Sequence, residues 1–377
     1  MKAGASFRAD QIAAILVVGI VGVLIPGLQP QLLGALAAEG RLSVAALGAL
    51  ASAELLAMGI AAGVAGFVLP SHRLRTIATT ALAATAILDL VTPYLAAGGI
   101  FAARIGAGFG EGVLIWIAIG FIARTARPER WSGIYLATQT LSQFALASLL
   151  GVYAAGSGAG FVALGAVTLV AAVAVRWLPA AYPPLVDEGS PGGLPPRRGL
   201  VGLGGVVLYL AFVVAVWVYV EPLGLQRGLA PATVHLIAPL SLAMQVLGAG
   251  AATLLAERLP TRATIAAVAA LNLALLAIMG APPSATWFVV ATAAFGFLWL
   301  FAMPFQVPAL IAADPSRRAA VLIGGAQLVG SSLGPVLGGL LVSDADVAPV
   351  LAFGAACLVA GVAALVAAGA LRHNAPA

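Results

Sequence analysis

At positions 200–222 the sequence reads LVGLGGVVLYLAFVVAVWVYVEP, and no charged residue interrupts it before Glu221. A helix that crosses a membrane needs about 20 consecutive apolar residues. The hydrophobicity of the stretch is continuous and does not alternate, which is typical of a spanning helix and not of a strand in a membrane barrel. The stretch therefore predicts a membrane protein, and the rest of the chain repeats its pattern.

The composition excludes most other classes of protein. Of 377 residues, 62% are hydrophobic and 8% are charged, and the mean hydropathy is +1.10. A soluble domain has about 25% charged residues, so this chain cannot cover the surface of a soluble enzyme or a nucleic-acid-binding protein. It has one cysteine, Cys357, which excludes an internal disulfide and a cysteine-based metal cluster. We expect no metal and no cofactor.

Apolar stretches recur along the whole chain, separated by short polar or Pro/Gly-rich segments. We expect an all-α protein with twelve transmembrane helices, at 9–37, 43–69, 74–97, 99–124, 131–154, 158–178, 200–222, 231–256, 262–280, 284–312, 317–342 and 347–371. The first stretch is too long for a signal peptide, and we interpret it as a span.

The basic residues predict the orientation of these spans. Fifteen Lys and Arg residues lie in segments that share one side of the membrane, and only Arg41 and Arg227 lie on the other. Because basic loops stay in the cytoplasm, both termini should be cytoplasmic. The net charge of +5 is then a signal of topology, and we expect no nucleic-acid partner.

The chain divides into two halves at a polar, Pro/Gly-rich segment. We expect an N-terminal six-helix bundle at 1–179, a cytoplasmic linker at 180–199 and a C-terminal six-helix bundle at 200–377. Residues in equivalent loops and spans recur at an offset of 187, in the pairs Arg75 and Arg262, Pro128 and Pro315, Arg130 and Arg317, and Gly151 and Gly338. Two parallel repeats are typical of transporters that move one half against the other around a central site.

A motif in the fourth span resembles the major facilitator superfamily. The sequence ARIGAGFGEG contains the R-x-x-x-G-x-G pattern of that family at Arg104, Gly108 and Gly110. The G-P-x-x-G-G motif that its antiporters carry in span 5 is found here in span 11, from Gly334 to Gly339. The resemblance extends over the whole chain and implies the fold of two pseudo-symmetric bundles.

The family's D-R-x-G-R-R loop also has a counterpart. In the loop after span 8, AERLPTR, Glu257 stands for the acid, Arg258 for the arginine and Arg262 for a later basic residue. The first-half copy, LPSHRLRT, has a proline in place of the acid and keeps only Arg73 and Arg75. The resemblance implies that these five residues belong to loops that control the conformational change.

Charged residues inside the membrane are costly and are functional candidates by default. Four lie near the bilayer centre of the predicted spans, namely Glu54, Asp89, Arg104 and Glu111, and the second half has no equivalent. Burial penalises the charged form of a carboxyl group, so Glu54, Glu111 and Asp89 are candidate proton carriers. The alternative is that they are protonated hydrogen-bonding groups that hold helices together.

Depth in the membrane predicts which of these charges meet. Arg104 and Asp89 should lie close together, whereas Arg104 and Glu111 are two turns apart, about 10 Å, so we expect no direct salt bridge between them. Arg104 is either a charge partner for these acids or a site for the anionic group of a substrate.

The resemblance implies that spans 1, 2, 4, 5, 7, 8, 10 and 11 line a central cavity. Candidate substrate-binding residues on these spans are Gln139, Gln143, Tyr209, Trp217, Gln245, Trp299, Gln306 and Gln327. Amide and aromatic side chains suit a partly apolar ligand, although packing or contact with lipid explains each of them equally well.

These observations predict a secondary active transporter of the bacterial inner membrane that functions as a monomer. We expect proton-coupled export of small organic compounds, as in drug/proton antiporters. The alternatives are a proton symporter that imports a small organic anion bound through Arg104, and an uncoupled facilitator. The sequence contains no Walker loop and no constellation of nucleophile and base, so we do not expect an enzyme.

Overall fold

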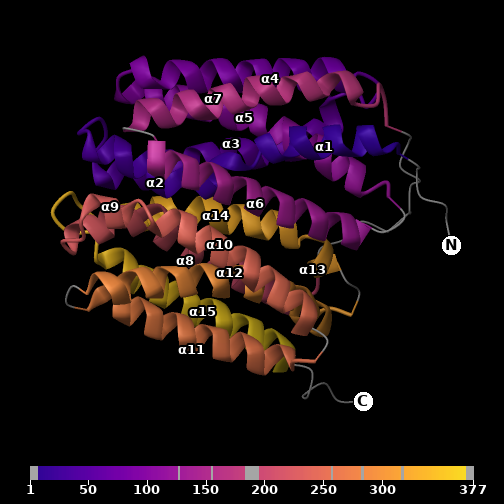
Figure 1. Cartoon of the computed structure of the whole chain (residues 1–377). Coiled ribbons are helices and arrows are strands. Elements are labelled where there is room, and N and C mark those ends of the chain that lie inside the picture. The colour runs from indigo at the N-terminus through magenta and orange to yellow at the C-terminus, as the bar shows by residue number, and fades with distance from the viewer. Residues whose placement is uncertain are drawn as a thin grey trace. The chain divides into compact units, whose positions relative to one another are not determined.

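The computed structural model describes residues 7–125, 128–153, 156–182, 195–255, 258–281, 284–315 and 318–370. These residues form helices joined by short turns, and no strand occurs among them (Figure 1). The expectation of an all-α protein is confirmed. Among these residues, ten helical segments are long and apolar enough to cross a membrane, which makes the chain a multi-pass membrane protein.

Contacts divide the chain into two compact units. Unit 1 comprises residues 1–41 and 53–189, and unit 2 comprises residues 42–52 and 190–377. The helix α3, Val44–Val68, contributes its first residues to unit 2 and the remainder to unit 1. Most of the predicted linker, residues 183–194, lies outside the described residues, as do Glu257 and Arg317.

The other helical elements of unit 1 are α1 (Ala9–Val21), α2 (Leu24–Ala38), α4 (Leu74–Val91), η1 (Thr92–Tyr94), α5 (Ala97–Ile122), α6 (Pro128–Tyr153), α7 (Ser157–Ala172) and η2 (Val173–Trp177). The single span expected at 9–37 is therefore two helices, interrupted at Gly22 and Val23. Together they still form one apolar segment long enough to cross a membrane.

Unit 2 is built around one long helix, α8, which packs against α14 and α15. Its elements are α8 (Arg197–Gln226), α9 (Pro231–Val234), α10 (Ile237–Leu255), α11 (Thr261–Gly280), α12 (Ala285–Ala313), α13 (Arg318–Val321), α14 (Ile323–Gly339) and α15 (Pro349–Ala370). The start of α3 joins this unit through two hydrogen bonds from its backbone to side chains: Val44 N–H donates to Asp344 Oδ1 at 2.6 Å, and Gly48 N–H donates to Tyr219 Oη at 2.9 Å.

Two predicted spans are helical but are not among the ten apolar segments. The span at 131–154 lies in α6, which carries a series of Thr, Ser and Gln side chains that lower its hydropathy. The span at 317–342 is divided between the four-residue α13 and the 17-residue α14. Hydroxyl groups on α6 donate back to carbonyls four residues earlier, for example Ser142 to Thr138 at 2.8 Å, which satisfies them without water.

At the end of unit 1 that contains the chain's first described residues, hydrogen bonds of Tyr182 and Arg75 connect the helices to the segment that follows α7. Tyr182 Oη donates to Ile117 O at 2.7 Å, and Tyr182 N–H donates to Ser71 O at 2.9 Å. Burial raises the pKa of the Tyr182 hydroxyl above its usual range. Beside it, Arg75 Nε donates to Leu178 O at 2.7 Å. This end of the unit fixes α4 and α5 against the segment that follows α7.

Candidate functional site

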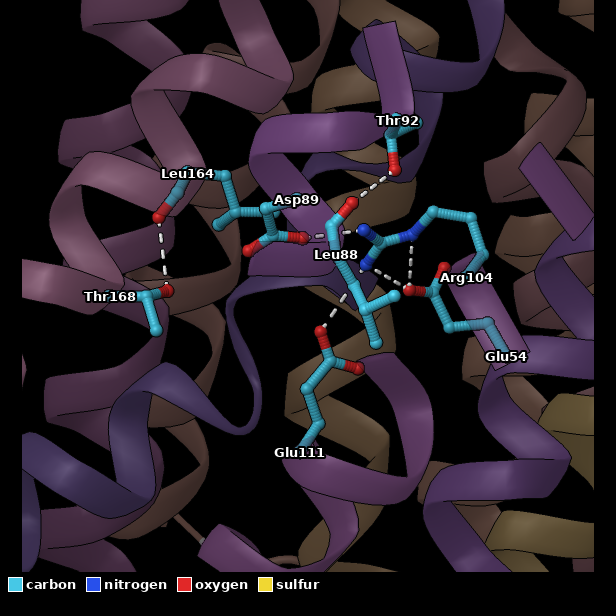
Figure 2. A network of polar contacts seen from close by, with 8 residues as sticks. All are labelled: Glu54, Leu88, Asp89, Thr92, Arg104, Glu111, Leu164 and Thr168. Atoms are coloured by element: carbon cyan, nitrogen blue, oxygen red, sulfur yellow. Dashed lines mark hydrogen bonds and ion pairs between the residues drawn. The ribbon is translucent and has the colours of Figure 1, made fainter. Parts of the chain in front are cut away.

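Four charged side chains meet in the interior of unit 1. Arg104 and Glu111 come from α5, Glu54 from α3 and Asp89 from the last turn of α4. Figure 2 shows the guanidinium of Arg104 surrounded by the three carboxyl groups. Each helix therefore contributes at least one group to a single cluster, which we call the acid–arginine cluster.

All three nitrogen atoms of the Arg104 guanidinium donate to carboxyl oxygens. Nε donates to Glu54 Oε1 at 2.8 Å, and Nη2 forms an ion pair with the same oxygen. Nη1 donates to Asp89 Oδ1 at 2.5 Å, and Nη2 reaches Glu111 Oε1 at 3.4 Å. The contact with Glu111 is the longest and rests on one nitrogen, so Glu111 is the most weakly held of the three acids.

The cluster is withdrawn from solvent. Glu54, Asp89 and Arg104 are 0% exposed, and Glu111 is 1% exposed. The ring of the buried Phe161, from α7, lies 5.2 Å from the central carbon of the guanidinium and covers one of its faces. At such a position each uncompensated charge is expensive, so the balance of charges in the cluster becomes decisive.

That balance is negative when every group is ionised. One guanidinium faces three carboxyl groups, and one oxygen of each, namely Glu54 Oε2, Asp89 Oδ2 and Glu111 Oε2, has no hydrogen-bond partner among the described residues. A buried carboxylate oxygen without a donor is costly, whereas a protonated one is not charged. The arrangement can therefore accept protons at defined atoms.

Glycines on α5 explain how three helices approach closely enough to build the cluster. A Cβ atom on Gly108 would lie 2.5 Å from the carbonyl oxygen of Glu54 and 3.2 Å from Ala57 Cβ. Gly112, one turn further, touches α3 in the same way. Small residues of this kind allow helix backbones in a membrane to come into contact.

A second pair of glycines faces α4. Side chains at Gly106 and Gly110 would meet Leu88 and Thr85, respectively. The two pairs alternate along α5, so the helix has one face without side chains against α3, at Gly108 and Gly112, and another against α4, at Gly106 and Gly110. The R-x-x-x-G-x-G motif therefore has a direct structural role, because its glycines bring the carboxyl groups within reach of its arginine.

The structure confirms one predicted contact and corrects another. Arg104 and Asp89 meet, as their depths in the membrane predict. The expectation that Arg104 and Glu111 form no direct salt bridge is wrong, because their side chains are 3.4 Å apart. The separation of two turns applies to the backbone, and two long side chains that extend toward each other along one face span that separation.

The second half contains a buried acid that the sequence analysis did not single out. Glu221 lies inside α8, which continues to Gln226, and it is 3% exposed, with no hydrogen-bond partner for Oε1 among the described residues. The sequence placed Glu221 at the last turn of a span that ended at Pro222. Hydropathy alone does not mark the additional turn, because Gln226 and Arg227 follow so closely.

Sequence reasoning also missed Gln29. It is 0% exposed in α2, and neither of its amide atoms has a partner among the described residues. The neighbouring Gln31 donates from Nε2 to Ala147 O at 3.1 Å, which ties α2 to α6. An amide next to Pro30 inside an apolar segment was the available signal, and it makes Gln29 a further polar candidate in unit 1.

The predicted substrate residues of unit 1 occupy different environments. Gln143 is 6% exposed and donates from Nε2 to Val23 O at 2.5 Å, at the interruption between α1 and α2. Gln139, one turn earlier on α6, is partly exposed. Gln143 is therefore engaged in packing, whereas Gln139 remains accessible.

In unit 2 the three predicted aromatic residues form a continuous row between α8 and α12 together with Phe212 and Phe295. Successive ring centroids are separated by 5.9, 5.7, 6.3 and 5.9 Å along the series Tyr209, Phe212, Phe295, Trp299 and Trp217. Offset and edge-to-face arrangements at such distances are favourable. Tyr209 and Trp217 are 4% and 1% exposed, so they form the interior of the unit, and only Trp299 is partly exposed.

The predicted amides of unit 2 are only partly satisfied. Gln327 Nε2 donates to Gln306 Oε1 at 3.3 Å, which links α14 to α12. Nε2 of Gln306 and Nε2 of Gln245 have no partner among the described residues, and both side chains are buried. Each of these two amides therefore keeps an unused hydrogen-bond donor.

The basic residues assigned to the conformational loops are distributed at helix starts and ends. Arg73 precedes α4 and is exposed, and Arg258 follows α10 and is exposed. Arg262 begins α11 and lines a cavity of about 270 Å³ with Pro260, Pro308 and neighbouring residues. The side chain of Arg130 lies outside the described residues, so the pairing of Arg130 with Arg317 stays a prediction.

No family model matches the sequence, and no curated protein does. A bacterial homologue of the human lysosomal transporter Spinster, in an inward-facing and occupied conformation, is 18% identical over 97% of this chain and 95% of its own, with a TM-score of 0.64. The same homologue, inward-facing and unoccupied, gives 17% identity and a TM-score of 0.62, covering 97% and 96% of the two chains.

The nucleoside transporter NupG is a further structural neighbour. It is 13% identical over 95% of this chain and 99% of its own, with a TM-score of 0.72. These structural neighbours are transporters. At such low identity the likeness establishes the architecture alone, which this chain shares with these transporters.

Proposed function

We propose that this protein is a secondary active transporter that exports a small organic compound in exchange for protons. The observation that carries the proposal is the acid–arginine cluster, in which one guanidinium and three carboxyl groups are buried together in a fold shared with transporters. A cluster of this kind is costly for stability alone, since apolar residues of similar volume would serve as well or better.

Protons are the coupling ion that the cluster fits best. With Arg104 ionised, a neutral cluster contains one carboxylate and two protonated acids, and three acid oxygens have no other hydrogen-bond partner among the described residues. Among those residues no group of three His, Cys, Asp or Glu side chains is arranged to hold a metal ion. A change in the exposure of the cluster would change how many protons it retains.

Among the three acids, Glu111 is our candidate for the group that exchanges its proton during transport. Glu54 accepts from two nitrogen atoms of Arg104, and Asp89 accepts one short hydrogen bond. Glu111 has a single contact of 3.4 Å with the guanidinium. Protonation weakens the charge-assisted hydrogen bond between an acid and the arginine, so it costs least for the acid whose contact with the arginine is weakest. Glu54 and Asp89 then keep Arg104 in place while Glu111 titrates.

The alternative of a symporter that imports an organic anion requires a donor for the anion. Every nitrogen of the Arg104 guanidinium already donates to a carboxyl group. A substrate carboxylate would have to displace one of three acids from a buried position. The geometry therefore favours antiport of a neutral or cationic compound.

Substrate contacts are assigned to the accessible or unsatisfied groups on the predicted spans. These are Gln139 in unit 1 and Gln245, Trp299 and Gln306 in unit 2. An aromatic ring and amide donors suit a planar, partly apolar compound. NupG is a nucleoside transporter, which makes nucleosides one class to include in a substrate screen.

The finer description of the fold belongs to the same proposal. We assign the chain to the major facilitator superfamily, with twelve spans in two six-helix bundles at 1–179 and 200–377 and a cytoplasmic linker at 180–199. In this assignment α6 and the pair α13 and α14 supply the two spans that are not among the ten apolar segments. The protein would lie in the bacterial inner membrane with both termini in the cytoplasm and would work as a monomer by alternating access.

The test uses purified protein in liposomes. Compounds that raise the melting temperature of the detergent-purified chain are selected from a panel that includes nucleosides and hydrophobic cations. Each is then assayed for movement against an imposed pH gradient, with an entrapped pH dye to record protons. We expect Glu111→Gln to abolish gradient-driven transport and to retain exchange of labelled for unlabelled compound, since exchange requires no net proton release.

A matched control is Glu221→Gln, which changes a buried glutamate outside the cluster. It should leave the coupling of protons to the compound intact. Full gradient-driven transport by Glu111→Gln would exclude Glu111 as the carrier, and the same result in a Glu54→Gln, Asp89→Asn, Glu111→Gln triple variant would remove proton coupling through the cluster altogether.

A further inference from the structure

The end of α8 in unit 2 borders a cavity that the proposed transport function does not use. The cavity has a volume of about 320 Å³ and is lined by Arg227, Leu229, Ile278, Ala281, Ser284, Trp287 and Phe288. Its walls come from the end of α8, the end of α11 and the start of α12. One cationic side chain thus lies in an otherwise largely apolar cavity.

The sequence fixes the position of this cation through the way α8 ends. Gly228 has a φ of 80°, its N–H donates to Leu225 O at 2.9 Å, and the N–H of Leu229 donates to Gly224 O at 3.1 Å. This is the Schellman pattern of helix termination, in which glycine takes the left-handed conformation. The turn folds Leu229 back against the unit, where it is 6% exposed, and leaves Arg227 at the helix end beside the cavity.

Arg227 differs from the other basic residue predicted on its side of the membrane. The guanidinium of Arg41 donates to the carbonyl oxygens of Leu95 at 2.8 Å and Thr92 at 3.3 Å. For Arg227, which is partly buried, no acceptor for the side chain occurs among the described residues, and no acidic side chain is among the described residues that line the cavity. A half-buried cation beside apolar walls is left to be matched by an external anion.

A second feature of the cavity also favours a negative group. Ser284 is the N-cap of α12, a helix of 29 residues, and its Oγ accepts the N–H of Trp287 at 3.4 Å. The first backbone N–H groups of α12 therefore lie at the cavity with the positive end of the helix dipole. Arg227 and this helix end converge on the same space.

The apolar walls of the cavity favour a lipid over a soluble anion as its ligand. Trp287 and Ile278 are 62% and 37% exposed at the rim, and Leu229 and Phe288 form the apolar interior. Because α11 and α12 are both long and apolar enough to cross a membrane, we infer that the rim faces lipid. Tryptophan at the end of a span is typical of the level of the lipid head groups. The space suffices for a head group and the beginning of an acyl chain, and the remaining chain would lie along the rim.

We propose that this cavity is a binding site for an anionic phospholipid, with the phosphate against Arg227 and the start of α12 and an acyl chain along Trp287 and Ile278. A lipid with a net negative charge is preferred over a zwitterionic one, because a zwitterion brings its own cation to the phosphate. The site stabilises the connections among α8, α11 and α12 in unit 2.

The test measures the melting temperature of the full-length protein in detergent during titration with phosphatidylglycerol, phosphatidylcholine or glycerol 3-phosphate. We expect phosphatidylglycerol to stabilise the protein at lower concentration than phosphatidylcholine, and glycerol 3-phosphate to have no effect. Arg227→Gln should raise the midpoint for phosphatidylglycerol about fivefold, the effect of losing roughly one surface cation near a lipid head group. Arg227→Lys should keep most of the preference.

The matched control is Arg197→Gln, at the opposite, exposed end of the same helix. It should leave the midpoint unchanged, which separates the cavity from general attraction of anionic lipid. A wild-type midpoint in Arg227→Gln would overturn the proposal, and so would equal stabilisation by glycerol 3-phosphate, which would make the cavity a site for soluble anions. Native mass spectrometry gives an independent readout, since Arg227→Gln should retain one phosphatidylglycerol fewer per chain than Arg197→Gln.

Discussion

Replacing Arg104 by glutamine should destabilise the protein in a way that depends on pH. The guanidinium is the single cation that contacts Glu54, Asp89 and Glu111 in the described part of the chain, and all four side chains are buried. Glutamine keeps much of the side-chain length and can still donate a hydrogen bond, but it carries no charge. Three acids then share an environment in which none can remain ionised at low cost.

The size of the effect follows from counting protons. With Arg104 present, one carboxylate is neutralised and up to two acids are protonated, whereas the variant must keep all three protonated. The additional proton is one that the unfolded chain releases above about pH 4.3, and holding it costs about 1.4 kcal/mol per pH unit. The variant should therefore be less stable than the wild type by about 4 kcal/mol at pH 7 and by about 1 kcal/mol at pH 5.

The assay is thermal unfolding of the detergent-purified chain between pH 5 and pH 7.5. The difference in melting temperature between Arg104→Gln and the wild type should shrink as the pH falls. The double variant Arg104→Gln, Glu54→Gln removes one acid together with the cation and should recover most of the lost stability at pH 7. A difference that is the same at every pH, or a double variant less stable than the single one, would refute the charge balance.

Three further predictions concern packing and topology. Gly108→Val should lower the melting temperature and uncouple transport, because even a Cβ at this position would lie 2.5 Å from the Glu54 carbonyl oxygen, and overpacking of this kind costs about 1 to 3 kcal/mol; Gly98→Val, with open space around it, is the control. Arg41→Gln should destabilise unit 1 by about 1 to 3 kcal/mol through the loss of two hydrogen bonds to carbonyl oxygens beyond α4, as measured by thermal unfolding. Cysteines introduced at Ser190 and Arg227 should differ in labelling of intact cells by an impermeant reagent, with only the latter labelled, and the opposite result would reverse the orientation.

The sequence was sufficient to predict the helical architecture because hydrophobic length is a strong signal. Continuous apolar stretches such as 200–222 leave no alternative to spanning helices. Interruptions inside a span are weaker signals, which is why the break between α1 and α2 and the short turn of α13 were not foreseen. Hydropathy averaged over a span does not register an interruption of one or two residues.

The candidate site was predicted only in part, because the depth of a residue in the membrane does not give the direction of its side chain. Counting residues from the span ends gives the depth of each charge in the membrane, and this predicted the contact between Asp89 and Arg104. Depth does not tell which way the side chains of α3 point, so it did not predict that Glu54 belongs to the cluster. The reach of long side chains was underestimated for Glu111. Glu221 was missed because the end of a helix was inferred from hydropathy, whereas the Schellman turn at Gly228 marks its actual end.

The spacing of residues on α5 suggests why proton binding and helix movement are linked in one device. Arg104, Gly108 and Glu111 are separated by four and three residues, so they share one face of the helix, and Gly108 on that face touches α3. From that face Arg104 holds Glu54 of α3 with two nitrogens and Asp89 of α4 with a third. Any rotation of α5 against either neighbour must break a contact of the guanidinium.

Breaking such a contact is costly while the acid is ionised and much less costly once it carries a proton, because only the ionised form forms a strong charge-assisted hydrogen bond. Glu111 lies on α5 with Arg104, so its own contact is not broken by that movement. Ionised Glu111 neutralises the guanidinium when the contacts to α3 and α4 break, whereas protonated Glu111 does not, so the protonation state of Glu111 sets the cost of moving α5. Coupling in this proposal requires no separate relay between a proton site and a hinge, since the same atoms serve both purposes. It follows that a variant in which α5 packs normally but the acids cannot titrate should still change conformation while losing its dependence on the pH gradient.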